Sequence, residues 1–183
     1  MTVDLDEIRR AREEADCLCS AEDVDQALGR LASDITARLH DKNPLIYVVM
    51  NGGLVLAGRL LPRLPFALEL AYLHATRYGH ALEGTLLDWR VRPTQDLRGR
   101  TVLVLDDILD EGVTLAAIAE RMMQLGATAC YTAVATDKEN GKQKPIKADF
   151  VALSVPDRFV FGYGMDVRGQ WRNLPAIYAM KDA

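Results

Sequence analysis

The segment at residues 101–125 constrains the fold more than any other part of the chain, because it joins a buried strand to a helix through a charged turn. Thr101–Leu105 is apolar after its first residue and carries two valines, which is typical of a strand covered on both faces. Asp106 and Asp107 follow directly, and a helical pattern over Val113–Leu125 begins after one glycine and ends at another. This strand–turn–helix arrangement predicts a parallel sheet with helices packed on it.

Similar patterns alternate along the rest of the chain. The first forty residues are expected to be helical, with Ser20–Asp23 resembling a capping box, and Leu54–Leu61 is expected to form a further helix. The polar segment His74–Arg98 is longer than an ordinary connection, so it is expected to be irregular and functional. Short apolar runs predict four more strands: Leu45–Met50, Phe66–Leu73, Ala129–Ala135 and Phe150–Val155. The fold class is therefore α/β, a central, mostly parallel sheet with helices on both faces.

Composition narrows the class of protein. The chain has 183 residues, of which 49% are hydrophobic, and this fits a single globular domain with a sizeable core. A net charge of −4 argues against a general nucleic-acid-binding surface, and no apolar run is long enough to cross a membrane. The charged N-terminus lacks a signal-peptide core, and the three cysteines form no CxxC pair, so we expect a cytoplasmic protein with reduced thiols.

The acids after Leu105 lie where a parallel sheet binds ligands. In open sheets the site forms at the carboxyl ends of the strands, and a helix N-terminus offers free amides and a positive dipole to a phosphate. Two carboxylates beside that pocket can hold a sugar diol, either directly or through Mg²⁺. The alternative is that Asp106, Asp107 and Asp110 are loop acids that stabilise the N-terminus of the next helix.

The whole string at residues 101–115 resembles the phosphoribosyl pyrophosphate-binding motif of type I phosphoribosyltransferases: four apolar residues, two acids, two apolar residues and a phosphate loop. An acid at Asp110 resembles the 6-oxopurine branch of that family. Later matches follow the order and spacing of its hypoxanthine-guanine enzymes, over residues 45–180: Asp137-Lys138, Asp149–Val151, Val155–Val160 and Gly162–Asp166.

The resemblance implies the architecture and the reaction. It implies one type I phosphoribosyltransferase domain over residues 1–183, with an N-terminal helical segment at 1–42 and a small hood to which residues 155–183 contribute. The implied function is purine salvage: the 5-phosphoribosyl group passes from phosphoribosyl pyrophosphate to hypoxanthine or guanine, with Mg²⁺, giving IMP or GMP and pyrophosphate. A homodimer or homotetramer is usual in the family. The open alternatives are a xanthine-preferring transferase and a non-catalytic, RNA-binding regulator on the same fold.

On the purine side, the resemblance assigns Asp110 as the general base near N7 and Lys138 as the donor to the 6-oxo group. A fixed donor discriminates strongly, because a 6-amino purine leaves a buried polar group unpaired. Phe159 is expected to stack on the base and Val160 to contact the purine edge through its backbone. The alternatives are that Lys138 is a solvated loop lysine and that Phe159 is a core residue.

On the phosphate side, Asn51, Gly52 and Gly53 resemble the pyrophosphate loop, in which a cis peptide, here Met50–Asn51, often precedes the glycines. Glycines let backbone amides approach phosphate oxygens. Arg172 matches the arginine that binds pyrophosphate. The resemblance places Mg²⁺ on three carboxylates: Asp106, Asp107 and Asp166.

The phosphate loop and a predicted lid carry the departures from the family. Glu111, Gly112 and Thr114 occupy the 5′-phosphate loop, where Glu111 replaces a hydroxyl residue; its carboxylate is expected to point away while its amide donates. The segment at residues 74–92 is expected to be a lid that excludes water, with Arg77 and Tyr78 in place of a serine–tyrosine pair. Asn51 replaces a basic residue, and Arg77 is a possible source of the missing charge.

Overall fold

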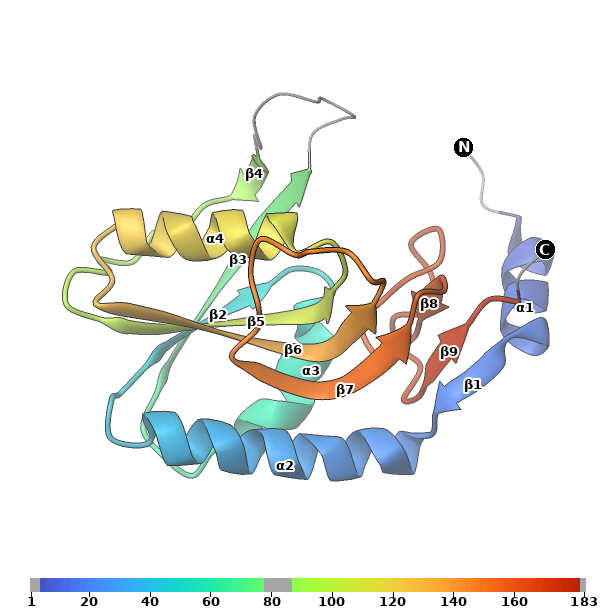
Figure 1. Cartoon of the computed structure of the whole chain (residues 1–183), viewed down its shortest axis with the longest axis horizontal. Coiled ribbons are helices and arrows are strands. Elements are labelled where there is room, and N and C mark those ends of the chain that lie inside the picture. The colour runs from blue at the N-terminus through green and yellow to red at the C-terminus, as the bar shows by residue number, and fades with distance from the viewer. Residues whose placement is uncertain (1–3, 78–86, 182–183) are drawn as a thin grey trace.

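The computed structural model describes residues 4–77 and 87–181, except for the side chains of Arg77 and Leu87. A six-stranded sheet forms its centre, in the order β4-β3-β2-β5-β6-β7 (Figure 1). All neighbouring strands in it are parallel except β3 and β4, which are antiparallel. The strands are β2 (Leu45–Val49), β3 (Glu69–Arg77), β4 (Leu87–Val91), β5 (Thr101–Leu109), β6 (Ala129–Glu139) and β7 (Phe150–Pro156).

Helices cover both faces of this sheet, as predicted. Helices α2 (Ala21–Leu39) and α3 (Gly53–Leu60) lie on one face, and α4 (Val113–Gln124) lies on the other (Figure 1). A short 3₁₀ helix, η1 (Leu61–Arg63), follows α3. Ile46 and Val48 pack in the core under α2 and α3, whereas Tyr47 packs in the core under α4. Two buried faces explain why the strand sequences are apolar without alternation.

Helix α2 begins where its sequence predicts, directly after Ser20. Ser20 Oγ accepts a hydrogen bond from the Asp23 amide at 3.1 Å, and the Asp23 carboxylate accepts one from the Ser20 amide at 2.8 Å. This capping box satisfies two amides that would otherwise lack partners at the start of α2. None of the helices in the described ranges has the length and apolarity needed to cross a membrane.

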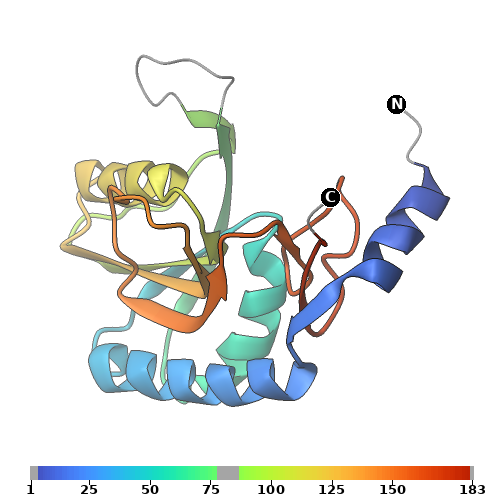
Figure 2. The same cartoon turned by 45° about the vertical axis from the view of Figure 1, so that its right-hand side comes forward.

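Strands from both ends of the chain form a second sheet, the hood, in the order β1-β9-β8 (Figure 2). It consists of β1 (Asp16–Cys19), β8 (Val160–Phe161) and β9 (Ile177–Ala179). Helix α1 (Leu5–Glu14) packs Ile8 against Phe161 and Tyr178. The prediction of a wholly helical N-terminal segment at 1–42 is therefore wrong at residues 16–19. The strand pairs with residues 177–179, and such a distant partner leaves no local signal.

The segment at residues 74–98 is also more regular than predicted. Strand β3 continues to Arg77, and β4 pairs with it from Leu87 to Val91. After Leu73, β3 mixes polar and apolar residues, and β4 alternates them, with Asp88 and Arg90 exposed. This part of the chain therefore lacks the continuous apolar run that marks the other strands. Strands β5 and β6 also extend past their apolar runs, because Leu109 still pairs with Asp137 at the sheet's edge. The acids Asp106 and Asp107 therefore lie within a strand rather than after it.

Candidate active site

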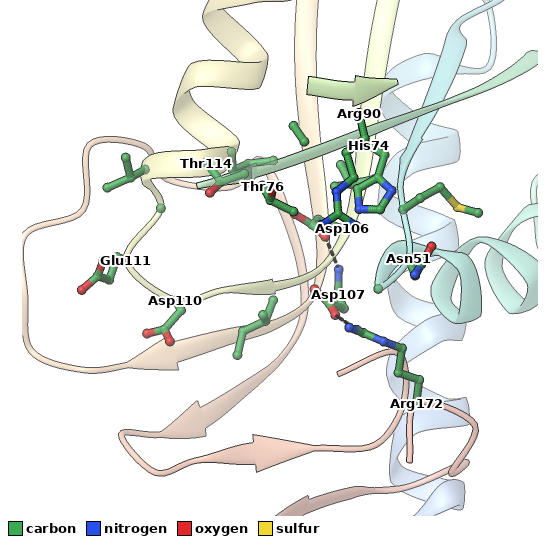
Figure 3. A pocket seen from close by; sticks show the side chains of 18 residues that line it. Asn51, His74, Thr76, Arg90, Asp106, Asp107, Asp110, Glu111, Thr114 and Arg172 are labelled. Atoms are coloured by element: carbon green, nitrogen blue, oxygen red, sulfur yellow. Dashed lines mark hydrogen bonds and ion pairs between the residues drawn. The ribbon is translucent and has the colours of Figure 1, made fainter. Parts of the chain in front are cut away.

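A cavity of about 500 Å³ opens at the carboxyl ends of β2 and β5, with residues of β3 and β4 also in its wall (Figure 3). Three segments that the sequence assigned to phosphate or ribose contribute to its wall: the turn after β2, the end of β5 and the first turn of α4. The predicted site residues that line it are Asn51, Gly52, Asp106, Asp107, Asp110, Glu111, Gly112, Thr114 and Arg172.

Two adjacent carboxylates form the floor of this cavity. The Asp107 amide donates to Asp106 Oδ1 at 2.9 Å, and Arg172 Nη1 lies 3.7 Å from Asp107 Oδ2. Burial raises the pKa of both acids, and the neighbouring charge of Asp107 raises the pKa of Asp106 further. The surroundings therefore disfavour the charged form of both acids in the free protein. A bound cation, or the hydroxyl donors of a diol, would stabilise the carboxylates.

The turn after β2 fits tightly against these acids. A Cβ added to Gly52 would lie 2.0 Å from Asp107 Oδ2, and one added to Gly164 would lie 2.3 Å from the Gly52 carbonyl oxygen. A Cβ on Gly53 would meet the Leu105 carbonyl at 2.6 Å. The Met50–Asn51 bond is cis, as predicted. Glycine is thus required here by space alone.

The start of α4 supplies the phosphate-binding geometry expected of the loop. Gly112 has φ of 78°, a left-handed conformation that favours glycine, and Thr114 lines the cavity in the first helical turn. The first amides of a helix have no partner within it and can bind an anion. The Glu111 carboxylate lies 3.8 Å from Lys142 Nζ, which draws it toward the β6–β7 loop.

Asp110 and Lys138 form an ion pair beside the phosphate loop. Lys138 Nζ donates to Asp110 Oδ2 at 2.8 Å, and Asn140 Nδ2 donates to the Asp110 carbonyl at 3.1 Å. The Lys138 side chain is 12% exposed, which is too buried for a solvated loop lysine. Asp110 lines the cavity, and Lys138 lies behind it. Two predicted purine-binding residues are thus in contact before any purine binds.

Arg172 connects the floor of the cavity to the hood. It contacts the Asp166 carboxylate, and its Nη1 donates to the Gly164 carbonyl at 2.6 Å. Asp166 also accepts a hydrogen bond from the Gly169 amide at 2.6 Å. Asp166 does not line the cavity itself, but through Arg172 it is linked to Asp107.

The structure does not bring every predicted residue into this cavity. Phe159 is 55% exposed, so it is not a core residue, and it lines a second cavity of about 620 Å³ against α1. Val160 is buried and paired with Ala179 in the hood. Tyr78 and the Arg77 side chain lie outside the described part of the chain. The roles of these residues stay predictions.

Three polar residues of the lining were not singled out by sequence reasoning as site residues: His74, Thr76 and Arg90. His74 and Thr76 alternate along β3 and so face the same side, and Arg90 comes from β4 (Figure 3). The pairing of β4 with the end of β3 places them there. All three lie within residues 74–92, the segment that the family resemblance predicted to be a lid, but nothing in the sequence marked them as individual site residues.

A parallel sheet with a hood, and two acids that precede a helix N-terminus at its edge, define the type I phosphoribosyltransferase class. Residues 20–168 match the family model described as the phosphoribosyl transferase domain. The chain belongs to this family.

Relatives of known name lie in one branch of it. The chain is 33% identical to the hypoxanthine-guanine phosphoribosyltransferase of Bacillus subtilis, over 91% of this chain and 93% of that protein. It is 29% identical to the hypoxanthine-guanine-xanthine phosphoribosyltransferase of Tritrichomonas foetus, over 91% of each. A hypoxanthine phosphoribosyltransferase structure from Staphylococcus aureus superposes with a TM-score of 0.85 at 27% identity, covering 93% of this chain and 94% of that one.

Proposed function

We propose that the protein is a purine-salvage enzyme that transfers the 5-phosphoribosyl group from phosphoribosyl pyrophosphate to hypoxanthine or guanine, releasing pyrophosphate. The observation that carries this proposal is the junction of β5 and α4. It puts two partly buried carboxylates next to a helix N-terminus in a chain of the phosphoribosyltransferase family. The similarity to the B. subtilis enzyme over 91% of the chain supports the choice of purine.

The substrate would lie across the cavity with its charged ends at different walls. The ribose hydroxyls bind Asp106 and Asp107, and the 5′-phosphate binds the amides from Glu111 to Thr114. Pyrophosphate lies against Asn51–Gly53 and Arg172, whose planar guanidinium suits bidentate contact with phosphate. Arg90 and His74 also line the cavity and offer further hydrogen-bond donors to the substrate.

The residues present fit Mg²⁺. Among the described residues no group of three His, Cys, Asp or Glu side chains forms a ready-made metal site, but Mg²⁺ usually takes one or two carboxylates together with substrate oxygens. Asp106 and Asp107 are hard oxygen donors whose pKa values are raised by burial, and Asp166 is a third carboxylate linked to them by Arg172. When bound, Mg²⁺ would neutralise charge on the pyrophosphate leaving group.

The protein's own part in the chemistry falls to the Asp110–Lys138 pair. Departure of pyrophosphate leaves positive charge on the anomeric carbon of the ribose, where N9 of the purine forms the new bond, and the five-membered ring of the purine must then lose its proton from N7. Asp110 accepts this proton at N7, and Lys138 donates to the 6-oxo oxygen. Because the two side chains are already 2.8 Å apart, they can engage N7 and O6, which are neighbouring atoms of one purine edge.

The proposed function is tested with one activity panel. Phosphoribosyl pyrophosphate is supplied with hypoxanthine, guanine, xanthine, adenine or uracil, with Mg²⁺ or with EDTA, and nucleotide formation is followed. We expect Mg²⁺-dependent IMP and GMP formation and little product from adenine or uracil. Product from none of the five bases would favour the non-catalytic regulator instead.

Xanthine is the specific alternative within the same chemistry. A relative 29% identical over 91% of the chain carries xanthine in its name as well as hypoxanthine and guanine. All three bases share the 6-oxo group that Lys138 would contact, so this contact does not separate them. A higher kcat/KM for xanthine than for the other two would establish the xanthine-preferring alternative.

We also propose that residues 1–183 act as one domain, in the cytoplasm, as a homodimer or homotetramer. The free thiols of Cys17, Cys19 and Cys130 suit a reducing compartment. Leu70 and Tyr72 on β3 are each 58% exposed, and such an apolar surface supports an interface between subunits. Light scattering at several concentrations would detect it, and a monomer throughout would contradict it.

A further inference from the structure

Lys144, in the loop between β6 and β7, makes three hydrogen bonds that could not be predicted from the sequence around it. Its Nζ donates to the Leu109 carbonyl at 2.8 Å, to the Lys138 carbonyl at 2.7 Å and to the Asp137 carboxylate at 2.5 Å. An ammonium group has three donors, so all of them are used. The side chain is 13% exposed. Lys144 is thus largely shielded from solvent and fully bonded, whereas Lys142 and Lys147 in the same loop are exposed.

The two carbonyls belong to two different strands. Leu109 is the last residue of β5, and Lys138 lies near the end of β6. Leu109 and Asp137 are the last pair in the register between these strands. Beyond this pair β5 turns away into the phosphate loop. Lys144 therefore bonds to both strands at the point where their own ladder ends.

The residues held in this way carry the predicted purine chemistry. Leu109 directly precedes Asp110, and the Lys138 carbonyl is one of the two bound by Lys144. The Asp110–Lys138 contact of 2.8 Å spans the same two strands. Lys144 also lies beside the phosphate loop, since its Cβ is 3.4 Å from the position that a Cβ on Gly112 would occupy.

We propose that Lys144 is a positioning residue for the purine: it fixes the separation of Asp110 and Lys138 by bonding to the backbone next to each. This inference rests on the proposed function. Catalytic groups must be held within a fraction of an ångström, and a misplacement of about 1 Å can lower the rate roughly 100-fold. Lys144 approaches the 5′-phosphate loop through its Cβ, whereas its three donors go to Leu109, Asp137 and Lys138. The affinity for phosphoribosyl pyrophosphate, which also rests on Asp106, Asp107 and Arg172, should therefore depend on these donors much less than the use of the purine does.

The first test is Lys144→Met, which keeps the aliphatic length and removes the three donors. We expect kcat/KM for hypoxanthine and guanine to fall roughly 10- to 100-fold. The KM for phosphoribosyl pyrophosphate should stay within about twofold of wild type, because a purely structural defect would disturb both substrates. The matched control is Lys147→Met, an exposed lysine of the same loop, which should leave both quantities unchanged.

A second variant separates positioning from the loss of a buried charge pair. Lys144→Met leaves the Asp137 carboxylate without this partner, and Asp137→Asn with Lys144→Met removes that charge too. We expect the double variant to recover thermal stability but not purine kcat/KM. Recovery of both, or an unchanged purine kcat/KM in Lys144→Met, would overturn the inference. A wild type inactive on every purine would overturn the proposed function, and this inference with it.

Discussion

The neighbouring strands β5 and β6 both carry charged side chains at the same edge of the sheet, but the free protein neutralises them differently. On β6, Asp137 is paired with Lys144 at 2.5 Å and Lys138 with Asp110 at 2.8 Å. On β5, Asp106 and Asp107 are adjacent and partly buried, and the nearest described cation in an ion pair, Arg172, is 3.7 Å from Asp107. The charged groups proposed to bind the purine are therefore paired before binding, whereas those proposed to bind the ribose would gain their partners from the ligand.

This difference separates two kinds of site residue. Residues around β6 form ion pairs in the free protein, and under the proposed function the same residues position the base, so stability and function would favour the same contacts. On β5, by contrast, the surroundings of Asp106 and Asp107 disfavour charged carboxylates, because burial raises the pKa of both acids. Substitutions at the two strands should consequently have different effects on turnover, substrate affinity and stability.

The largest effect is expected for Asp110→Asn, which removes the proposed general base while keeping the side chain's size. Turnover should fall roughly 10²- to 10⁴-fold, the usual contribution of a general base. The affinity for phosphoribosyl pyrophosphate should change much less, because Asp106 and Asp107 are untouched. The measurement is single-turnover kinetics, in which chemistry limits the rate; near-normal turnover there would remove Asp110 from its role.

A smaller loss is expected at Lys138. A hydrogen bond to a charged group is worth about 1.5–3 kcal/mol, so Lys138→Ala should lower kcat/KM for hypoxanthine and guanine roughly 10- to 100-fold. Lys138→Gln should lose less, since it keeps a donor without the charge. Activity with adenine should be near zero in the wild type, and we expect it to stay low in both variants. An unchanged kcat/KM in Lys138→Ala would mean that the lysine only pairs with Asp110 and does not meet the purine.

The predictable parts of the molecule are those whose signal is local. Strand β2 is apolar at every position because both of its faces are buried, and the start of α2 is marked by Ser20 and Asp23. Asp106, Asp107 and Gly112 were found because a strand, two acids, a glycine and a helix follow one another within fifteen residues. The family resemblance added roles to these residues that composition and spacing could not supply.

The missed parts depend on contacts between distant segments. Strand β1 exists because residues 177–179 pair with it, and β4 exists because β3 continues past its apolar part. His74, Thr76 and Arg90 line the cavity only once these polar strands have paired. Lys144 lies among three other lysines between residues 138 and 147, and nothing in that run shows which one the fold buries.

Arg90 offers an intermediate effect on the phosphate side. Its side chain lines the same cavity as Asn51, the position at which the family resemblance leads us to expect a basic residue (Figure 3). Arg90→Ala should raise the KM for phosphoribosyl pyrophosphate about tenfold, the lower end for a charged hydrogen bond, because Arg90 is exposed. The KM for purine should hardly change. The control is Arg92→Ala, an exposed arginine just beyond β4 that does not line the cavity; an equal effect in both would indicate only a general loss of positive charge.

The smallest effect is a gain in stability, and it tests the contrast between β5 and β6 directly. The pKa of Asp106 is raised in the folded protein, so the folded state favours the protonated acid and its charged form opposes folding. The stability that the protonated acid contributes is fully present below its unfolded pKa, about 4, and is lost as pH rises toward the folded pKa. Asp106→Asn should therefore raise the melting temperature by a few degrees at neutral pH, about 2–4 °C for each kcal/mol regained. The advantage should shrink as the pH is lowered toward 4.

Thermal denaturation of the ligand-free protein in EDTA, from pH 4 to pH 8, measures this gain. Asp96 is the matched control, because hydrogen bonds from Arg98 lower its pKa to about 2 and favour its charged form, so Asp96→Asn should bring no such gain. A melting temperature of Asp106→Asn below that of wild type at pH 7 would mean that the carboxylate stabilises the free fold. The ribose side would then be as well neutralised before binding as the purine side, and the contrast between the two strands would not hold.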